Sequence, residues 1–253
     1  AVSSYNVGIG NYTLDAAMNG ANSNTAIGYR AASALTTGDD NVIIGKDAGY
    51  YMTTASGSVM IGESVAGGTT GNRNIGIGYR TMSGNGVTGD NNIAIGASAG
   101  DALTSGVDNI FMGRQAGGAL TTGNLNIAIG YLSGDALTDG VQNTAVGYEA
   151  LSTSTGVTWV TAIGAGAMGD GNLTSDADGS TAVGVNALKA LTSGIGNVAV
   201  GGFALDAEDD GDYNTAVGYQ ALTAQTGTTG TVANTAVGYK AGAAIVKGKY
   251  NTA

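Results

Sequence analysis

Two groups of acidic residues are the first candidates for chemistry in this chain of 253 residues. They are Asp206, Glu208, Asp209, Asp210 and Asp212 in the denser group, and Asp176 with Asp178 in the smaller one. Oxygen-rich clusters beside glycine can bind calcium, although neither spacing matches an ordered calcium loop. We therefore predict solvated turns and assign no metal ligand, with a bound calcium ion as the alternative.

Other catalytic chemistry finds little support in the residue types. A pair of carboxylates could hydrolyse glycosides across a groove, but the 19 acidic residues lie mainly in predicted turns without a long insertion. Residues 164–169 match GxGxxG, yet no helical pattern follows, as a dinucleotide site would require. The chain has no Cys and no His, which excludes a thiol nucleophile, an imidazole base, a zinc-type site and a disulfide. We predict a protein that is not an enzyme, with no catalytic or cofactor-binding residues and no cofactor.

Tyrosines form a candidate binding row. The residues directly after a recurring glycine include Tyr29, Tyr79, Tyr131, Tyr148, Tyr219 and Tyr239. Because Lys46, Glu63 and Arg114 occupy the same position elsewhere, we expect the position to reach solvent. Exposed aromatic rows can stack on sugar rings, but stacking of the tyrosines on one another is the simpler interpretation and the one we favour. Trp159 lies alone in an irregular stretch.

The composition limits the partners. The net charge of -10 argues against nucleic acid, whose phosphates would be repelled. No run of 18 apolar residues occurs, so we expect no insertion into a membrane. The 46 glycines come without a single proline, which excludes collagen and fits a sheet in which nearly every backbone N–H is needed.

All of these residues lie within one short repeat. Its marker is the glycine that closes motifs such as Asn-Thr-Ala-Val-Gly, and successive markers are 17 residues apart in eight of thirteen steps. They are Gly10, Gly28, Gly45, Gly62, Gly78, Gly96, Gly113, Gly130, Gly147, Gly164, Gly184, Gly201, Gly218 and Gly238. This period is too short for repeats built from helix pairs. It predicts an all-β fold, a β-solenoid (β-roll or β-helix) of about 15 short rungs at roughly 4.8 Å each, or about 70 Å in length.

We expect residues 1–253 to form a single continuous repeat domain. A fifteenth copy begins at Asn251 and breaks off, and residue 1 is Ala without a visible signal peptide. We therefore interpret the chain as an excerpt of a longer fibre or as a processed chain.

Each repeat position predicts a place in the rung. The residue three before the glycine is always β-branched and the one directly before it is always apolar, so both are predicted to fill the inside of the coil. The residue between them is small except at Ile43, Met60 and Phe111, and we expect it to contact neighbouring protomers. Asn precedes the strand in twelve of fifteen copies, which predicts a ladder of stacked amides.

The segments after the glycine predict a second, shorter strand or extended wall followed by a polar corner. The clearest copies read Ala-Leu-Thr-Thr-Gly or close variants, as at Ala34 to Gly38. A helix is rejected because one of useful length does not fit in the repeat. Two copies are stretched to 20 residues, and their extra residues, in 168–179 and 221–233, are predicted to be surface loops.

The sequence Asn-Thr-Ala-Val-Gly-Tyr-Gln-Ala-Leu, from Asn214 to Leu222, closely resembles the repeats of phage tail fibre-like proteins. It also resembles the Asn-Ser-Val-Ala-Ile-Gly-type repeats in the heads of trimeric autotransporter adhesins, although its period of 17 is longer than theirs. The resemblance covers essentially the whole chain and implies a left-handed β-roll assembled as a homotrimer. It further implies an extracellular location, on a virion or a cell surface.

We therefore expect a structural extracellular fibre or adhesin segment, a rigid rod that extends or presents an attachment site for a glycan or protein receptor. A polymerising cell-surface filament subunit is the main alternative. A carbohydrate-degrading tailspike would need two close carboxylates in a groove, which the sequence does not show. An ice-binding solenoid is disfavoured because Thr alternates with Val and Ile at a position predicted to point inward.

Overall fold

The structure, a computed structural model, describes residues 2–84, 86–174, 177–227 and 229–253. The chain divides into two compact units, Ala1–Asn124 and Leu125–Ala253. Both units consist of short parallel strands, one for each sequence repeat, and the described residues form no α-helix. The chain is therefore a β-solenoid, as its repeat predicts. Nor does the described part of the chain hold any helix suited to crossing a membrane.

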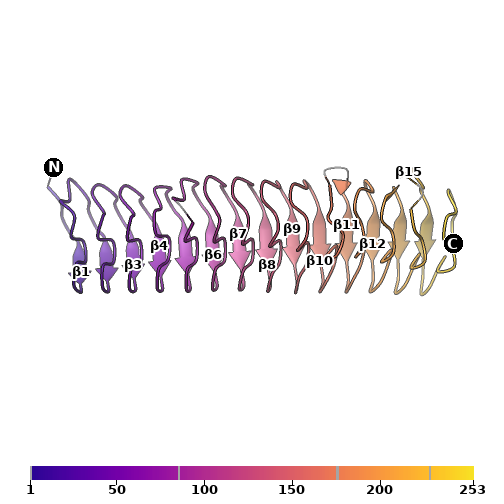
Figure 1. Cartoon of the computed structure of the whole chain (residues 1–253), viewed down its shortest axis with the longest axis horizontal. Helices are drawn as coiled ribbons and strands as arrows, with labels where there is room; N and C mark the ends of the chain where they lie inside the picture. Colours follow the sequence, from indigo (N-terminus) through magenta and orange to yellow (C-terminus); the bar gives the residue numbers. More distant parts are fainter. Residues whose placement is uncertain (1, 85, 175–176, 228) are drawn as a thin grey trace. The chain divides into compact units, whose positions relative to one another are not determined.

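The strands occupy the three residues before each marker glycine, and within each unit their arrows lie side by side (Figure 1). In unit 1 they are β1 (Val7–Ile9), β2 (Thr25–Ile27), β3 (Val42–Ile44), β4 (Val59–Ile61), β5 (Ile75–Ile77), β6 (Ile93–Ile95) and β7 (Ile110–Met112). In unit 2 they are β8 (Ile127–Ile129), β9 (Thr144–Val146), β10 (Thr161–Ile163), β11 (Thr181–Val183), β12 (Val198–Val200), β14 (Thr215–Val217) and β16 (Thr235–Val237). Two further strands of unit 2, β13 (Gly211–Asp212) and β15 (Gly230–Thr231), pair with each other in a small second sheet.

Strand register follows the repeat regardless of rung length. Val42 pairs with Val59 across a 17-residue step, Val59 with Ile75 across 16, and Thr161 with Thr181 across 20. Equivalent positions therefore stack directly above one another, and the extra residues of long rungs are accommodated outside the strand.

The inside and outside of the strand are the reverse of the sequence-based prediction. The middle residue is completely buried, as at Ala26 and Ala145, whereas the residues on either side of it are partly exposed. The small residue thus faces the interior of the coil, and the β-branched and apolar residues face outward. Size explains the choice, because a rung of 17 residues encloses too little space for a large side chain at every middle position.

The predicted asparagine ladder is confirmed. Asn41 Nδ2 donates to Asn24 Oδ1 in the preceding rung at 2.9 Å and to the carbonyl of Ala55 in the next rung at 2.8 Å. The same Asn24 Oδ1 accepts the backbone N–H of Asn41 at 3.0 Å. The amides are buried, so this network satisfies polar groups that water cannot reach.

The marker glycines also stack, and here the backbone needs glycine. Gly28 has φ of +135°, and a Cβ at this position would lie 2.5 Å from the carbonyl oxygen of Gly45. Both the left-handed conformation and the close approach of the next rung therefore exclude a side chain.

The segment that follows each marker glycine consists of turns, and we call it the turn wall. The predicted second strand is therefore wrong for these residues. Left-handed residues alternate there, for example Asp47 with φ of 54° and Gly49 with φ of 55°. The N–H of Asp47 donates back to Tyr29 O at 2.9 Å, and that of Gly49 donates forward to Val65 O at 2.9 Å. Because alternate N–H groups point to opposite neighbours, this wall hydrogen-bonds between rungs without being a strand.

Candidate functional site

In each unit, the outward face of the strands that precede the marker glycines, called the main sheet here, is a candidate interaction surface. It consists of two rows, the first and third residues of each strand, and neither row contains a charged residue. Even strands with a neighbour on both sides within one unit leave these side chains accessible: Ile163 of β10 is 38% exposed and Val200 of β12 is 37% exposed. The row of third residues is apolar in every one of these strands, and an exposed apolar row without charges is a candidate surface for a partner.

Glu208 departs from the solvated turn that the sequence predicts for the dense acidic group, whereas Asp209 is exposed as predicted and the other members are partly exposed. Glu208 is fully buried, and its Oε1 accepts the backbone N–H of Gly211 at 2.7 Å. Carboxylate oxygens of Glu208, Asp209 and Asp210 lie within 4.8 Å of one another. Asp209 Oδ1 accepts the N–H of Gly227 at 2.9 Å, so these carboxylates also shape the corner between two rungs.

Glu208 occupies the place in its rung that Leu35 occupies in an ordinary one. In the next rung the same place holds Gln225, whose Nε2 donates to Glu208 Oε2 at 2.5 Å. Gln225 Oε1 in turn accepts from Asn234 Nδ2 at 2.8 Å. A buried polar chain therefore runs from the acidic corner into the asparagine ladder.

The other motifs have structural places. Of the smaller acidic pair, Asp176 lies outside the described residues, and Asp178 Oδ1 accepts the backbone N–H of Thr158 at 2.7 Å. In the GxGxxG segment, Gly164 is a member of the glycine stack, and the residues after it belong to the turn wall. Trp159 Nε1 donates to Gln142 Oε1 at 2.7 Å in the neighbouring rung.

Tyrosine stacking is confirmed where tyrosines occupy adjacent rungs. The rings of Tyr219 and Tyr239 lie nearly parallel at 10° with centroids 6.0 Å apart, and those of Tyr131 and Tyr148 lie 5.5 Å apart. Most of these side chains are exposed, as predicted. Tyr29, by contrast, meets Tyr12 edge to face, with an angle of 88° between the rings.

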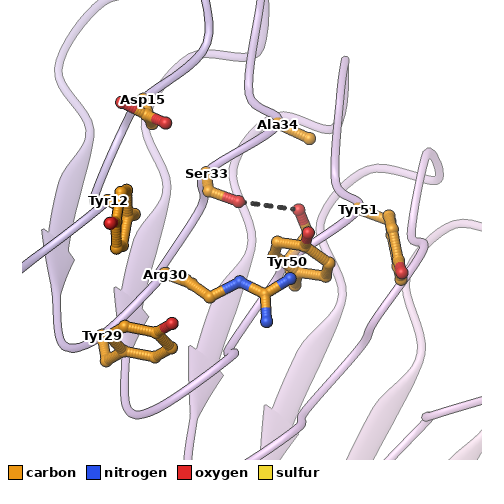
Figure 2. A pocket seen from close by; sticks show the side chains of 8 residues that line it. All are labelled: Tyr12, Asp15, Tyr29, Arg30, Ser33, Ala34, Tyr50 and Tyr51. Atoms are coloured by element: carbon orange, nitrogen blue, oxygen red, sulfur yellow. Dashed lines mark hydrogen bonds between the residues drawn. The ribbon is translucent and has the colours of Figure 1, made fainter.

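Tyr12 and Tyr29 border a hollow of about 590 Å³ in unit 1 (Figure 2). Its lining comes from three consecutive rungs of the turn wall and comprises Tyr12, Asp15, Tyr29, Arg30, Ser33, Ala34, Tyr50 and Tyr51. Figure 2 shows Arg30 extending from the side of Tyr12 and Tyr29 toward Tyr50. The four tyrosines occupy four different positions of the repeat. Comparing equivalent positions along the chain therefore does not predict that they lie together.

Local contacts change the ionisation of a few groups. A side-chain hydrogen bond with Tyr50 raises the pKa of Arg30, and the negative charge of Asp47 raises it by a smaller amount. The guanidinium is therefore always charged. A hydrogen bond to Glu63 raises the pKa of Lys46, and partial burial raises the pKa of the Asp135 carboxyl. A hydrogen bond to Glu149 raises the pKa of the Tyr148 hydroxyl.

In sequence comparisons, no protein-family model matches the chain and no curated protein matches it. The geometry of the surfaces is therefore the ground for proposals about function.

Proposed function

We propose that the chain is a structural extracellular fibre or adhesin segment that assembles as a homotrimer and extends or presents an attachment site. The observation that carries the proposal is the outer face of the main sheet, which holds no charged residue and whose row of third residues is apolar throughout the described strands. Its extracellular location is part of the same proposal and rests on the resemblance of the repeat to tail fibre and adhesin repeats.

The outer face supports assembly because it repeats the chemistry of a buried sheet. Parallel strands are normally covered on both faces, and here the coil interior covers only one. Ile129, Ile163 and Val200 are exposed residues of this face and belong to every second rung, those of β8, β10 and β12. Charged pairs lie instead on the turn wall, such as Lys46 with Glu63 at 2.8 Å and Lys189 with Asp170 at 3.0 Å. Burying the sheet against further copies removes the apolar rows from water without desolvating a charge.

A homotrimer of this kind acts mechanically. The backbone ladder, the asparagine ladder and the glycine stack resist bending because each rung is hydrogen-bonded to the next. Symmetry presents any weak surface site three times, and binding through several sites raises avidity without new contacts.

The mass of the chain in solution tests the proposal. We expect sedimentation at low concentration to give a trimer, with and without a calcium chelator. Ile163→Lys combined with Val200→Lys places two charges in the outer rows and is expected to give monomers that stay folded by circular dichroism. Val185→Lys is the matched control, because Val185 is 49% exposed but lies on the turn wall. A monomeric parent chain would overturn the trimer, and a polymer that grows with concentration would favour the filament subunit.

Ice binding is a second candidate because threonines of unit 2 face outward, contrary to the sequence-based prediction. Thr144, Thr161 and Thr181 start three successive strands and stack in register, each beside an outward Val or Ile. Such a flat, regular row of hydroxyl and methyl groups suits ordered water. This function requires a face open to solvent, so it predicts a monomer that shows thermal hysteresis, and Thr161→Lys is expected to abolish the hysteresis.

A further inference from the structure

We propose that the hollow bounded by Tyr12, Tyr29, Tyr50 and Tyr51 binds a neutral oligosaccharide, with sugar rings held against the tyrosine faces. The biological role of this site rests on the proposed function, because a fibre that attaches to a surface needs a ligand there. The binding itself stands on the geometry of unit 1.

The aromatic walls of the hollow are available to a ligand. Tyr12 and Tyr29 meet edge to face at 5.8 Å, and the rings of Tyr50 and Tyr51 are tilted by 58°. Neither pair is stacked in parallel, unlike the Tyr219 pair described above. Arg30 covers one face of Tyr50, so the rings offered to a sugar are chiefly those of Tyr12, Tyr29 and Tyr51. Tyr12 is 60% exposed and Tyr51 is 65% exposed. An exposed tyrosine combines an apolar ring, which packs on the C–H face of a sugar, with a hydroxyl that can hydrogen-bond.

Arg30 provides a fixed donor between the aromatic walls. Its guanidinium carbon lies 3.6 Å from the centroid of the Tyr50 ring, and its Nη1 lies 3.5 Å from Asp47 Oδ1. These two contacts hold the planar group in one orientation, so its other N–H groups have a defined direction.

Two further polar groups complete the lining. Asp15 is exposed and offers a carboxylate acceptor from the first rung. Ser33 Oγ donates to the carbonyl of Tyr50 at 3.4 Å, which leaves its oxygen able to accept. Apolar walls with a few convergent donors and acceptors are the composition expected of a small-molecule site, and about 590 Å³ is within the usual size range.

The charges favour a neutral sugar over an anionic one. The positive charge of Arg30 already faces Asp47, and Asp15 adds a second carboxylate on the open side of the hollow. In this first hollow, a sialic acid or sulfate group would meet no positive charge other than that of Arg30, which is paired with Asp47, and the chain has a net charge of -10.

A second hollow indicates that the ligand is longer than one sugar. This hollow has a volume of about 230 Å³ and shares Tyr50 and Tyr51 with the first, while Arg80 and Ser83 line its other side. The two tyrosines thus form a ridge between two adjoining spaces. An oligosaccharide that crosses the ridge would place successive rings on either side of it.

Saturation-transfer NMR on the purified chain tests the site. The probes are neutral tetrasaccharides of glucose, mannose, galactose and N-acetylglucosamine at millimolar concentration, with sialyllactose as the anionic comparison. We expect at least one neutral tetrasaccharide to bind and sialyllactose to bind more weakly or not at all. Absence of binding by all four neutral probes, or binding of sialyllactose alone, overturns the proposal.

Variants locate the binding. Tyr29→Ala and Tyr51→Ala are each expected to weaken binding about tenfold, which corresponds to about 1.4 kcal/mol, and Asp15→Asn to weaken it several-fold. Tyr219→Ala is the control, because Tyr219 occupies the same repeat position as Tyr29 and is 47% exposed against 45%. Equal loss in Tyr219→Ala, or no loss in Tyr29→Ala and Tyr51→Ala, places the ligand elsewhere and refutes the site.

The mass of the same samples separates this proposal from the fibre proposal. A trimer that binds no neutral saccharide refutes the site and leaves the fibre intact. A monomer that binds through Tyr29 and Tyr51 keeps the site and refutes the trimer.

Discussion

Asn41 contacts Asn24 in the preceding rung twice, through its side-chain Nδ2 at 2.9 Å and through its backbone N–H at 3.0 Å, both directed at the same Oδ1. In the next rung, the N–H of Ser58 donates to Asn41 Oδ1 at 2.9 Å. One amide thus joins three rungs at a buried corner. It accounts for the asparagine that precedes most strands, since no other side chain of this length offers both an acceptor and two donors.

Replacing Asn41 is expected to destabilise the solenoid in a graded way. Asn41→Ala removes the acceptor of the Ser58 N–H and the donor to the Ala55 carbonyl, so the cost is about 2–4 kcal/mol. Asn41→Ser is expected to cost less, because Ser58 occupies the equivalent place natively and its Oγ accepts the N–H of Asn74 at 3.2 Å. Asn41→Asp should cost most, since it places a carboxylate against the Ala55 carbonyl.

Guanidinium unfolding followed by circular dichroism measures the order of these costs, and hydrogen exchange at the Ser58 amide reports the local effect. Faster exchange there in Asn41→Ala with unchanged exchange in distant rungs is the expected result. Equal stability of the Ala variant and the parent chain would show that the ladder is incidental.

Two glycines of the stack allow the cost of backbone strain to be measured separately from the cost of a clash between a Cβ and the next rung. Gly147 has φ of +140°, and a Cβ would lie 2.6 Å from the carbonyl oxygen of Gly164. Gly238 has nearly the same φ of +138°, but a Cβ there would meet only Ala241 Cβ at 3.9 Å. We expect Gly238→Ala to cost about 1–3 kcal/mol from backbone strain alone, and Gly147→Ala to cost clearly more. Thermal unfolding of both variants checks this, and equal costs would mean that the close approach relaxes freely.

The period of the repeat predicted the strands and their register, but it did not predict which strand face points inward. Apolar residues occupy both faces of strands such as Val42–Ile44, so polarity gives no direction. The usable signal was size: Ala at the middle position fits a narrow coil, and Ile43, Met60 and Phe111 are the exceptions that fill it locally. Phe111 is accommodated because Gly100 and Gly117 lie against its ring.

The tyrosine hollow could not be predicted for a different reason. Tyr12, Tyr29, Tyr50 and Tyr51 come from repeat positions that are not stacked on one another. They converge because left-handed residues in the turn wall, such as Tyr12 with φ of 59° and Arg30 with φ of 57°, change the direction of the backbone from one position to the next. A sequence repeat identifies rows along the solenoid, whereas this site runs across them.

The buried pair of Glu208 and Gln225 predicts non-additive mutations. Glu208→Leu leaves Gln225 Nε2 without its acceptor, and Gln225→Leu leaves Oε2 of the buried Glu208 carboxylate without its donor, so each is expected to cost about 2–4 kcal/mol. The double variant rebuilds the apolar place that Leu35 occupies in an ordinary rung and should recover most of the loss. Denaturant unfolding of the four proteins gives the coupling energy, and a double variant as unstable as the sum of the singles contradicts the prediction.

Partial burial of Asp135 predicts a specific dependence of stability on pH. Burial raises the pKa of its carboxyl in the folded state above the ordinary value of 3.8, so the folded chain binds this proton more tightly than the unfolded chain does. Below about pH 3.8 the carboxyl is protonated in both states and has no effect on stability. As the pH rises through the folded-state pKa, the charge develops in a partly desolvated position and stability falls.

Asp135→Asn removes this loss of stability, so the variant should be as stable as the parent chain in acid and more stable than it at neutral pH. Unfolding midpoints across this pH range measure the difference, with the exposed Asp139→Asn as the control, and a constant difference at every pH would rule out ionisation as its cause.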